Sequence, residues 1–153
     1  MSPDWVAAPE ECTCLAVRQA ARRVTQFYDH FLAPVGLRTT QFSILSKLRR
    51  VGETTINELA AEMVMDRTTL GRNVLPLERE GLISIEPSRI DRRSKTVKLT
   101  GEGRKRLEEA RERWRGAQTG FARAFGEERT VHLRSLLRQA TGTELPEAST
   151  AKQ

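Results

Sequence analysis

The residues best suited to chemistry in this sequence lie close together, between Asp66 and Lys95. Just after Asp66 comes a set of polar residues with short or forked side chains: Arg67, Thr68, Thr69, Arg72 and Asn73. Between them Leu70, Val74 and Leu77 recur at spacings of four and three, which in a helix separates an apolar face from a polar one. Hydroxyl, amide and guanidinium groups on such a face can form hydrogen bonds with base edges and phosphates. These residue types therefore favour hydrogen bonding to a nucleic acid over catalysis.

A second polar group follows on a predicted loop. Apolar residues alternate with polar ones at 83–86 and again at 96–99, which predicts two antiparallel strands around the loop 87–95. The charged residues of this loop are Arg89, Asp91, Arg92, Arg93 and Lys95. In an extended segment Arg89, Asp91 and Arg93 project to one side, so the Asp91 carboxylate could hold an arginine guanidinium by a charge-assisted hydrogen bond. An arginine held in this way suits the electronegative minor groove of DNA.

The distribution of charge supports a polyanionic partner. The 153 residues carry a formal net charge of +6. Between Arg67 and Arg106 eleven residues are basic and five are acidic, so this segment holds the whole excess. Nucleic acid or a membrane surface would attract such a charge. No apolar run approaches the roughly 18 residues of a membrane helix, and the N-terminus lacks the charged and apolar regions of a signal peptide. We therefore expect a cytoplasmic protein with no membrane partner.

Catalysis and metal binding find little support. His30 and His132 are the only histidines, and neither has a metal-ligand neighbour at helical spacing. The sequence contains no glycine-rich phosphate loop and no nucleophile elbow. Cys12 and Cys14 are too few for a disulfide framework or a four-ligand zinc site. We expect no enzyme, no metal and no cofactor.

Two long helical segments enclose the polar region. The first has apolar residues at spacings of three and four across 17–31, with Pro9 in its first turn and an end before Pro34. The second shows near-heptad apolar spacing across 107–125 and is followed by a final helix that ends at Gly142. An apolar face this long needs another surface to pack on.

Shorter helices are predicted between these two segments from their capping residues. The expected N-caps are Thr39 or Thr40, Thr55 with Glu58 as a capping box, Asp66, and Thr100. Pro76 lies inside the helix that Asp66 caps, where it removes one backbone hydrogen bond and should kink the helix or thin its last turn. Gly81 ends that helix, and Leu82 can close a contact over its last turn.

At this point the sequence resembles a known family. The strings VMDRTTLGRNVLPLEREGLI and IDRRSKTVKLTGEG resemble the MarR family of bacterial transcriptional regulators. The most diagnostic residues are Asp91, Arg93, Leu99, Thr100 and Gly103. The resemblance implies a mainly α (α+β) winged helix-turn-helix fold with six helices and a two- to three-stranded wing. It also implies a homodimer that binds a pseudo-palindromic operator in double-stranded DNA.

The resemblance also implies a division of labour along the chain. Segments 9–36 and 101–142 would form a helical dimerisation region, 37–100 the DNA-binding domain, and 1–8 and 143–153 flexible termini. The residues implied to enter the major groove are Arg67, Thr68, Thr69, Arg72 and Asn73. Arg93 would enter the minor groove, steadied by Asp91, while Arg92 and Lys95 would contact phosphates. The competing interpretation for the helix residues is solvated charge or polar filler without a DNA contact.

Two kinds of effector site are compatible with the sequence. Cys14 falls where the organic-peroxide-sensing branch of the family has its reactive cysteine, and Tyr28 matches one hydroxyl partner, but Thr39 and Arg18 occupy the other positions. We favour a buried, inert thiol over a reactive one. If Cys12 and Cys14 are both helical, they point about 200° apart. The family also suggests small aromatic or lipophilic anions, and a pocket for them could include Tyr28, His30, Phe42 and Trp114. Each of these four could equally be a core or surface residue.

The polar helix face and the basic loop, together with what the resemblance implies, lead us to expect a ligand- or oxidant-responsive repressor that binds its operator as a homodimer. The competing class is a winged-helix protein without effector response that coats DNA non-specifically or binds a partner protein.

Overall fold

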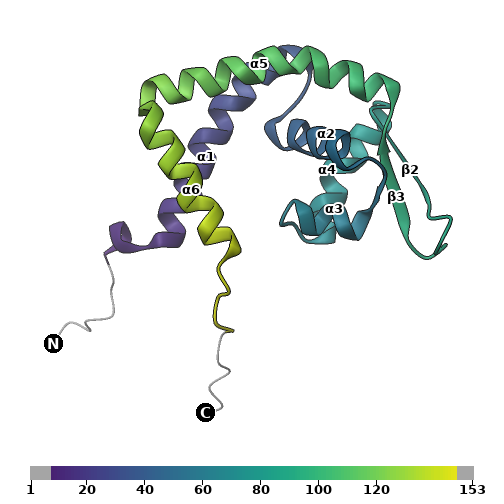
Figure 1. Cartoon of the computed structure of the whole chain (residues 1–153), viewed down its shortest axis with the longest axis horizontal. Helices are drawn as coiled ribbons and strands as arrows, with labels where there is room; N and C mark the ends of the chain where they lie inside the picture. The colour runs from purple at the N-terminus through teal and green to yellow at the C-terminus, as the bar shows by residue number, and fades with distance from the viewer. Residues whose placement is uncertain (1–7, 148–153) are drawn as a thin grey trace. The chain divides into compact units, whose positions relative to one another are not determined.

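The computed structural model describes residues 8–147, and within them the chain forms six α-helices and one three-stranded sheet (Figure 1). The helices are α1 (Thr13–Leu32), α2 (Thr39–Val51), α3 (Ile56–Glu62), α4 (Arg67–Arg79), α5 (Gly101–Phe125) and α6 (Glu127–Gly142). The chain divides into two units, Met1–Ala117 and Gln118–Gln153, with the boundary inside α5. The expected six helices and small sheet are confirmed. Of the expected flexible termini, 1–7 and 148–153 lie outside the described residues.

The sheet is antiparallel and holds the predicted hairpin. Its strands are β1 (Thr54–Thr55), β2 (Ile83–Pro87) and β3 (Lys95–Leu99), in the order β1-β3-β2. In the β2–β3 pair, Ile83 lies opposite Leu99 and Ile85 opposite Val97. Because side chains alternate across a strand, this register puts the apolar residues of both strands on one face. β2 packs against α4 and β3 against α2, so the hairpin is fixed to the helices at its base.

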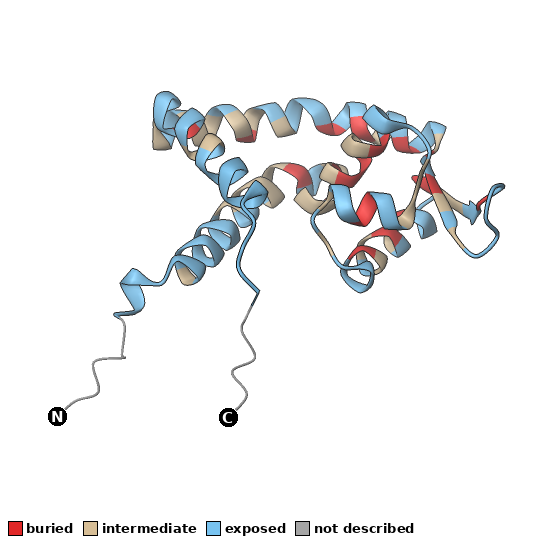
Figure 2. Ribbon diagram, turned by 60° about the horizontal axis from the view of Figure 1, so that its bottom comes forward, coloured by how far each residue is buried: buried red, intermediate tan, exposed pale blue. Residues whose placement is uncertain are grey.

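The core of the first unit lies among α2, α3, α4 and the hairpin, with Leu32 from the end of α1 and Leu107 and Ala110 from α5 (Figure 2). Its largest fully buried side chains are Leu32, Ile44, Leu45, Leu48, Leu59, Leu70, Leu77, Leu82, Ile83 and Val97. α3 has only seven residues, too few for a helix to be stable alone in water. Its stability therefore comes from packing, with Leu59 fully buried, and from its ends.

Helix capping partly follows the sequence prediction. The Thr55–Glu58 capping box is confirmed, because Thr55 Oγ1 accepts a hydrogen bond from Glu58 N at 3.1 Å and Glu58 Oε2 accepts one from Thr55 N at 3.0 Å. The cap predicted for α2 is wrong. Thr39 is already helical, and its backbone N–H and hydroxyl both donate to Asp29 Oδ1, at 2.6 and 2.7 Å. α1 thus supplies a carboxylate to the positive end of α2, where it is favoured.

The start of α1 also differs from the prediction. Pro9 lies in a separate 3-10 helix (Pro9–Glu11), and α1 begins at Thr13. Cys12 is the N-cap, with φ −77° and ψ 106°, and its Sγ accepts a hydrogen bond from Leu15 N at 3.4 Å. The assumption that both cysteines are helical is therefore wrong for Cys12. The other end is confirmed, because α1 stops at Leu32, before Pro34.

α5 begins directly on the turn that ends α4. Thr100 caps α5 as predicted, since its Oγ1 accepts a hydrogen bond from Gly103 N at 3.0 Å and donates one to Gly81 O at 2.6 Å. At Gly103 a Cβ would overlap the carbonyl oxygen of Leu82 and lie 2.8 Å from Leu99 Cδ1. Only glycine permits this approach, which gives a physical reason for a glycine three residues after the capping threonine.

The second unit contains the end of α5 and all of α6. Gly126, at φ 106°, separates the two helices as predicted. Phe121 and Phe125 stack with their ring centroids 5.4 Å apart, and the Arg129 guanidinium lies 4.3 Å from the centre of the Phe125 ring. In the described residues no helix combines the length and apolar character needed to cross a lipid bilayer.

Candidate nucleic-acid interface

The N-terminus of α4 is held by Asp66, as predicted. Asp66 Oδ1 accepts a hydrogen bond from Thr69 N at 2.8 Å, and Oδ2 accepts one from the Thr69 hydroxyl at 2.7 Å. These hydrogen bonds, led by that from the Thr69 backbone, lower the pKa of the Asp66 carboxyl. The group therefore stays charged at the positive end of the helix dipole.

α4 has the two faces that its sequence predicts. Leu70, Val74 and Leu77 are buried. The members of the polar set are exposed, except that Asn73 is half-buried: Arg67, Thr68, Thr69, Arg72 and Asn73. Asn73 donates from Nδ2 to Thr69 O at 2.8 Å, so part of its hydrogen-bonding capacity is used inside the helix. Within residues 8–147, by contrast, the side chains of Thr68 and Arg72 form no hydrogen bond or ion pair.

Pro76 does not end α4 or remove its last turn. The α-helix continues for three residues beyond it to Arg79, and Glu80 N donates to Pro76 O at 3.0 Å. Gly81, at φ 72°, ends the helix as predicted. Leu82 N donates to Leu77 O at 2.9 Å, and both leucine side chains are fully buried, so the expected closing contact is confirmed.

The wing loop is a compact turn, not the extended segment that was predicted. Ser88 N donates to Ser94 O at 2.9 Å, which closes the loop at its base. Ser88 is buried, and its Oγ accepts hydrogen bonds from the backbone of Ile90 and Asp91 at 3.2 and 3.4 Å. Sequence reasoning did not identify Ser88 or Ser94, because their role depends on the fold of the loop and no periodic pattern marks it.

Asp91 organises the wing through the backbone. Its Oδ1 accepts a hydrogen bond from Arg93 N at 3.0 Å, and Ser94 N donates to its carbonyl oxygen at 3.0 Å. Across residues 8–147 its carboxylate forms no ion pair, so the expected bond to an arginine guanidinium is wrong. An aspartate that bonds to the backbone two residues later is a common turn geometry. Asp91 therefore positions Arg93 by fixing its main chain.

The structure brings the start of α4 and the wing together around one hollow. Arg67, Arg93 and Lys95 all line this hollow of about 360 Å³, together with Asn57 from α3 and with Asp91 and Ser94 from the wing. The rest of the polar set on α4 and Arg92 on the wing do not line it. Of the five polar residues predicted on α4, Arg67 is thus the one that lines the hollow with the wing residues.

Internal ion pairs leave the basic residues of this interface unneutralised. The ion pairs among the described residues are Lys47–Glu62, Arg49–Glu108, Lys98–Glu86, Arg106–Glu80 and Arg111–Glu108. The predicted DNA-contacting cations take part in none of them: Arg67, Arg72, Arg92, Arg93 and Lys95. Their charges are therefore available to an external anion.

The predicted effector pocket is only partly assembled. Phe42 and Trp114 stack with ring centroids 5.7 Å apart, and both line a hollow of about 650 Å³ between α2 and α5. Tyr28 and His30 do not line it; they contact Phe27 and Phe31 instead, at centroid distances of 5.9 and 6.4 Å. The sequence had not indicated the cations that do line it: Lys47, Arg49, Arg50 and Arg111.

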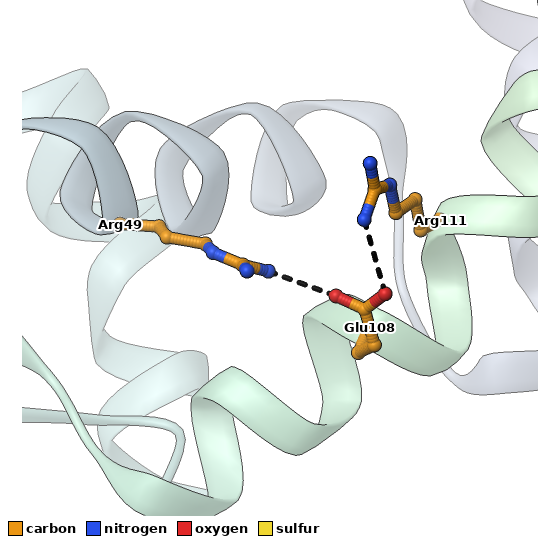
Figure 3. A network of polar contacts seen from close by, with 3 residues as sticks. All are labelled: Arg49, Glu108 and Arg111. Carbon is orange, nitrogen blue, oxygen red and sulfur yellow. Dashed lines mark hydrogen bonds and ion pairs between the residues drawn. The ribbon is translucent and has the colours of Figure 1, made fainter.

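One carboxylate organises the basic edge of this hollow. Glu108 lies between two guanidinium groups (Figure 3) and bonds to Arg49 at 2.9 Å and to Arg111 at 3.2 Å. The hydrogen bond from Arg49, followed by that from Arg111, lowers the pKa of Glu108. Two arginines that share one carboxylate retain a net positive charge beside the aromatic pair.

Both cysteines are exposed, so the favoured interpretation of a buried thiol at Cys14 is wrong for this chain. Cys14 lies in the first turn of α1, two residues after the capping Cys12. Among the described residues no group of three His, Cys, Asp or Glu side chains is placed to hold a metal ion.

Comparison with known proteins agrees with this geometry. Residues 37–95 match the model of the MarR family. An uncharacterized HTH-type transcriptional regulator of Bacillus subtilis (strain 168), YwoH, is 32% identical over 93 residues, which cover 61% of this chain and 67% of that protein. The M. tuberculosis transcriptional regulator MosR, in complex with DNA, is 36% identical with a TM-score of 0.71, over 87% of this chain and all of MosR.

A second DNA complex has the same fold. The transcriptional repressor CouR, bound to a 23-mer DNA duplex, is 28% identical with a TM-score of 0.78, over 86% of this chain and 94% of CouR. These relatives are regulators of transcription, and no catalytic family is indicated. The chain belongs to the MarR family of DNA-binding transcriptional regulators, and its fold is the winged helix-turn-helix.

Proposed function

We propose that the protein is a homodimeric repressor that binds a pseudo-palindromic DNA operator and releases it in response to an effector. The observation that carries this proposal is the pairing of a capped, polar α4 with a wing whose basic residues have no internal ion-pair partner. Thr68, Thr69, Arg72 and Asn73 are proposed to meet base edges in the major groove. Arg93 is proposed to enter the adjacent minor groove.

The proposed division of labour follows from burial. Segment 37–100 contains most of the core and would bind DNA, whereas 9–36 and 101–142 would join two copies. On α1, Val17 is 47% exposed, and on α6 Leu136 and Leu137 are 48% and 44% exposed. Apolar side chains repeated along helices in this way favour burial against a second subunit.

Selection of bound sites from a random DNA pool tests this function. A dimeric specific regulator should enrich an inverted repeat and bind it about a thousandfold or more tightly than random DNA at near-physiological salt. A protein that only coats DNA would enrich no motif and show almost no preference. That second outcome, or a stable monomer, would contradict the proposal.

The hollow between α2 and α5 supports an aromatic or lipophilic carboxylate as the effector. Its volume of about 650 Å³ falls in the usual range for small-molecule sites, and it combines the Phe42–Trp114 pair with basic residues. A thermal-shift screen of aromatic acids should find stabilising compounds that also weaken operator binding. Trp114→Ala should remove that stabilisation, and neutral isosteres of the acids should bind less well.

The exposed Cys14 thiol supports an oxidant as the other class of effector. Peroxide should then release the operator from the parent protein but not from Cys14→Ser, with a reductant restoring binding to the parent. Equal release from both proteins would rule out Cys14 as the sensing thiol, and no release from the parent would rule out an oxidant as the effector.

A further inference from the structure

The hollow beside the wing gathers cations from two separate parts of the chain. Arg67 is the first residue of α4, whereas Arg93 and Lys95 come from the wing loop and the start of β3. Asn57, near the start of α3, adds an amide that can donate hydrogen bonds. Three cations and the single carboxylate of Asp91 leave a formal excess of two positive charges.

The fold holds these cations together without internal compensation. Across residues 8–147 the side chains of Arg67, Arg93 and Lys95 form no ion pair and no hydrogen bond, and neither does that of Asn57. The carboxylate that lines the hollow, Asp91, already accepts the backbone N–H of Arg93. Gathering like charges is unfavourable unless an anion offsets it. The arrangement therefore calls for an anion from outside the chain.

The backbone around the hollow is fixed before any anion arrives. The wing side is closed by the hydrogen bond from Ser88 N to Ser94 O at 2.9 Å and by those to Asp91. The helix side is fixed by Asp66, which caps α4 beside Arg67. Arg67 lines the hollow and Arg72 does not. Arg72 follows five residues later, about 140° around the helix axis and roughly 7.5 Å farther along it, so its side chain leaves α4 at another place.

We propose that this hollow binds one phosphate of the DNA backbone, and that Arg67 contacts this phosphate and not a base edge. Lys95 and Asn57 complete the site, and Arg93 lies at its border beside the minor groove. The proposal rests on the proposed function, because the DNA strand must pass between α4 and the wing. It adds Asn57 to the interface and reassigns Arg67 from reading sequence to fixing the position of the protein on DNA.

Neutral backbone linkages test the site directly. The selected operator is prepared as a series of duplexes in which one phosphate at a time is replaced by a methylphosphonate. For the parent, one position in each half-site should weaken binding at least several-fold. For Arg67→Ala and Asn57→Ala, the same replacement should cause little further loss. Arg134→Ala, which removes an exposed arginine of α6, should retain the full penalty at that position.

The salt dependence gives a second measurement on the same variants. Arg67→Ala should reduce the slope of log K against log salt by about 0.9, the value for one lost phosphate contact. Its ratio of operator to random-DNA affinity should stay close to that of the parent, because a phosphate contact weakens all sequences alike. A base-reading Arg67 would instead relax the preference at one base pair, and that result would overturn the proposal.

These experiments distinguish a failure of the proposed function from a failure of the proposed phosphate site. If the parent binds no operator, the proposed function fails. If the parent binds its operator but every methylphosphonate position affects Arg67→Ala as it affects the parent, only the phosphate site is wrong. Titration of the DNA-free protein with inorganic phosphate at constant ionic strength tests whether the hollow binds free phosphate. Binding there that needs Arg67, without any coupling to a DNA phosphate, would overturn the assignment to the DNA backbone.

Discussion

Two aspartates of the interface serve a basic surface without neutralising it. Asp66 and Asp91 both accept hydrogen bonds from backbone N–H groups, of Thr69 and Arg93 respectively, and neither pairs with a guanidinium in the described residues. Each carboxylate thus fixes the main chain that carries a basic residue and does not neutralise that residue's charge. Replacing either aspartate should therefore change the backbone conformation at the basic residues more than it changes their electrostatic attraction to an anion.

The capping carboxylate of Asp66 should make the folded protein less stable at low pH. Because its pKa is lowered in the folded state, its contribution is complete above the unfolded value of about 3.9 and is lost as the pH falls through the folded value. Asp66→Asn keeps a capping acceptor but cannot titrate. Thermal unfolding between about pH 6 and pH 2 should therefore show a smaller acid-induced fall in Tm for Asp66→Asn than for the parent. Glu112→Gln, on the exposed side of α5, should behave like the parent.

The two wing cations should differ in what their loss does to DNA binding. Arg93→Ala should weaken binding by an amount that depends on the sequence at the minor groove, on the order of 1–3 kcal/mol at the preferred base pairs. Lys95→Ala should weaken operator and random DNA alike and lower the salt slope by about one. Titrations of both variants on operators with A·T-rich and G·C-rich flanks measure this. Parent-like binding by both would show that the wing does not contact DNA.

Among the elements, the junction of α4, the hairpin and α5 sets the geometry of the site. The end of α4 binds the start of α5 through the hydroxyl of Thr100 and the carbonyl of Gly81. The backbone N–H of Thr100 also donates a hydrogen bond to the carbonyl oxygen of Leu82, at 3.1 Å. Since β2 and β3 leave from this same junction, a shift here would move the wing relative to α4.

Gly103→Ala tests how closely this junction is packed. A methyl group there meets the Leu82 backbone, which cannot move aside as a flexible side chain could. We expect a loss of about 1–3 kcal/mol in the free energy of unfolding, measured with denaturant. Gly71→Ala is the matched control, because a Cβ there meets nothing within 4 Å beyond its chain neighbours and the backbone of its own helix, and alanine favours a helix by up to about 1 kcal/mol. Equal stabilisation by both substitutions would mean that the junction is not tight.

At this scale, the features that could be predicted from the sequence are those formed by residues close together along the chain. The periods of α4 and the hairpin, and the caps at Thr55 and Asp66, involve neighbours within four residues and were predicted correctly. The cap of α2 comes from Asp29, ten residues away, so a local rule chose Thr39 or Thr40 instead. The grouping of Arg67 with Lys95 joins residues 28 positions apart, which no helical or strand period links.

At the scale of the whole molecule, the apolar residues that one chain leaves exposed require explanation. The near-heptad spacing of 107–125 and the apolar face of 17–31 predicted long packing surfaces. Figure 2 shows much of α1 and α6 as exposed, and Val17, Leu136 and Leu137 are each more than 40% exposed. A second copy would supply a surface to bury them and would also place two wings and two α4 helices on one DNA duplex.

Leu136→Asp tests whether this surface joins two copies. A carboxylate buried at a subunit interface without a partner is costly, so the variant should sediment as a monomer at concentrations where the parent is a dimer. Its affinity for a full operator should fall by at least about a hundredfold, because the two half-sites are no longer bound by linked subunits. Arg138→Asp is the matched control, since it introduces the same group about 200° around α6. If Leu136→Asp remained dimeric while retaining its fold, α6 would not form the interface, and the proposed dimer contact would have to come from α1 and α5.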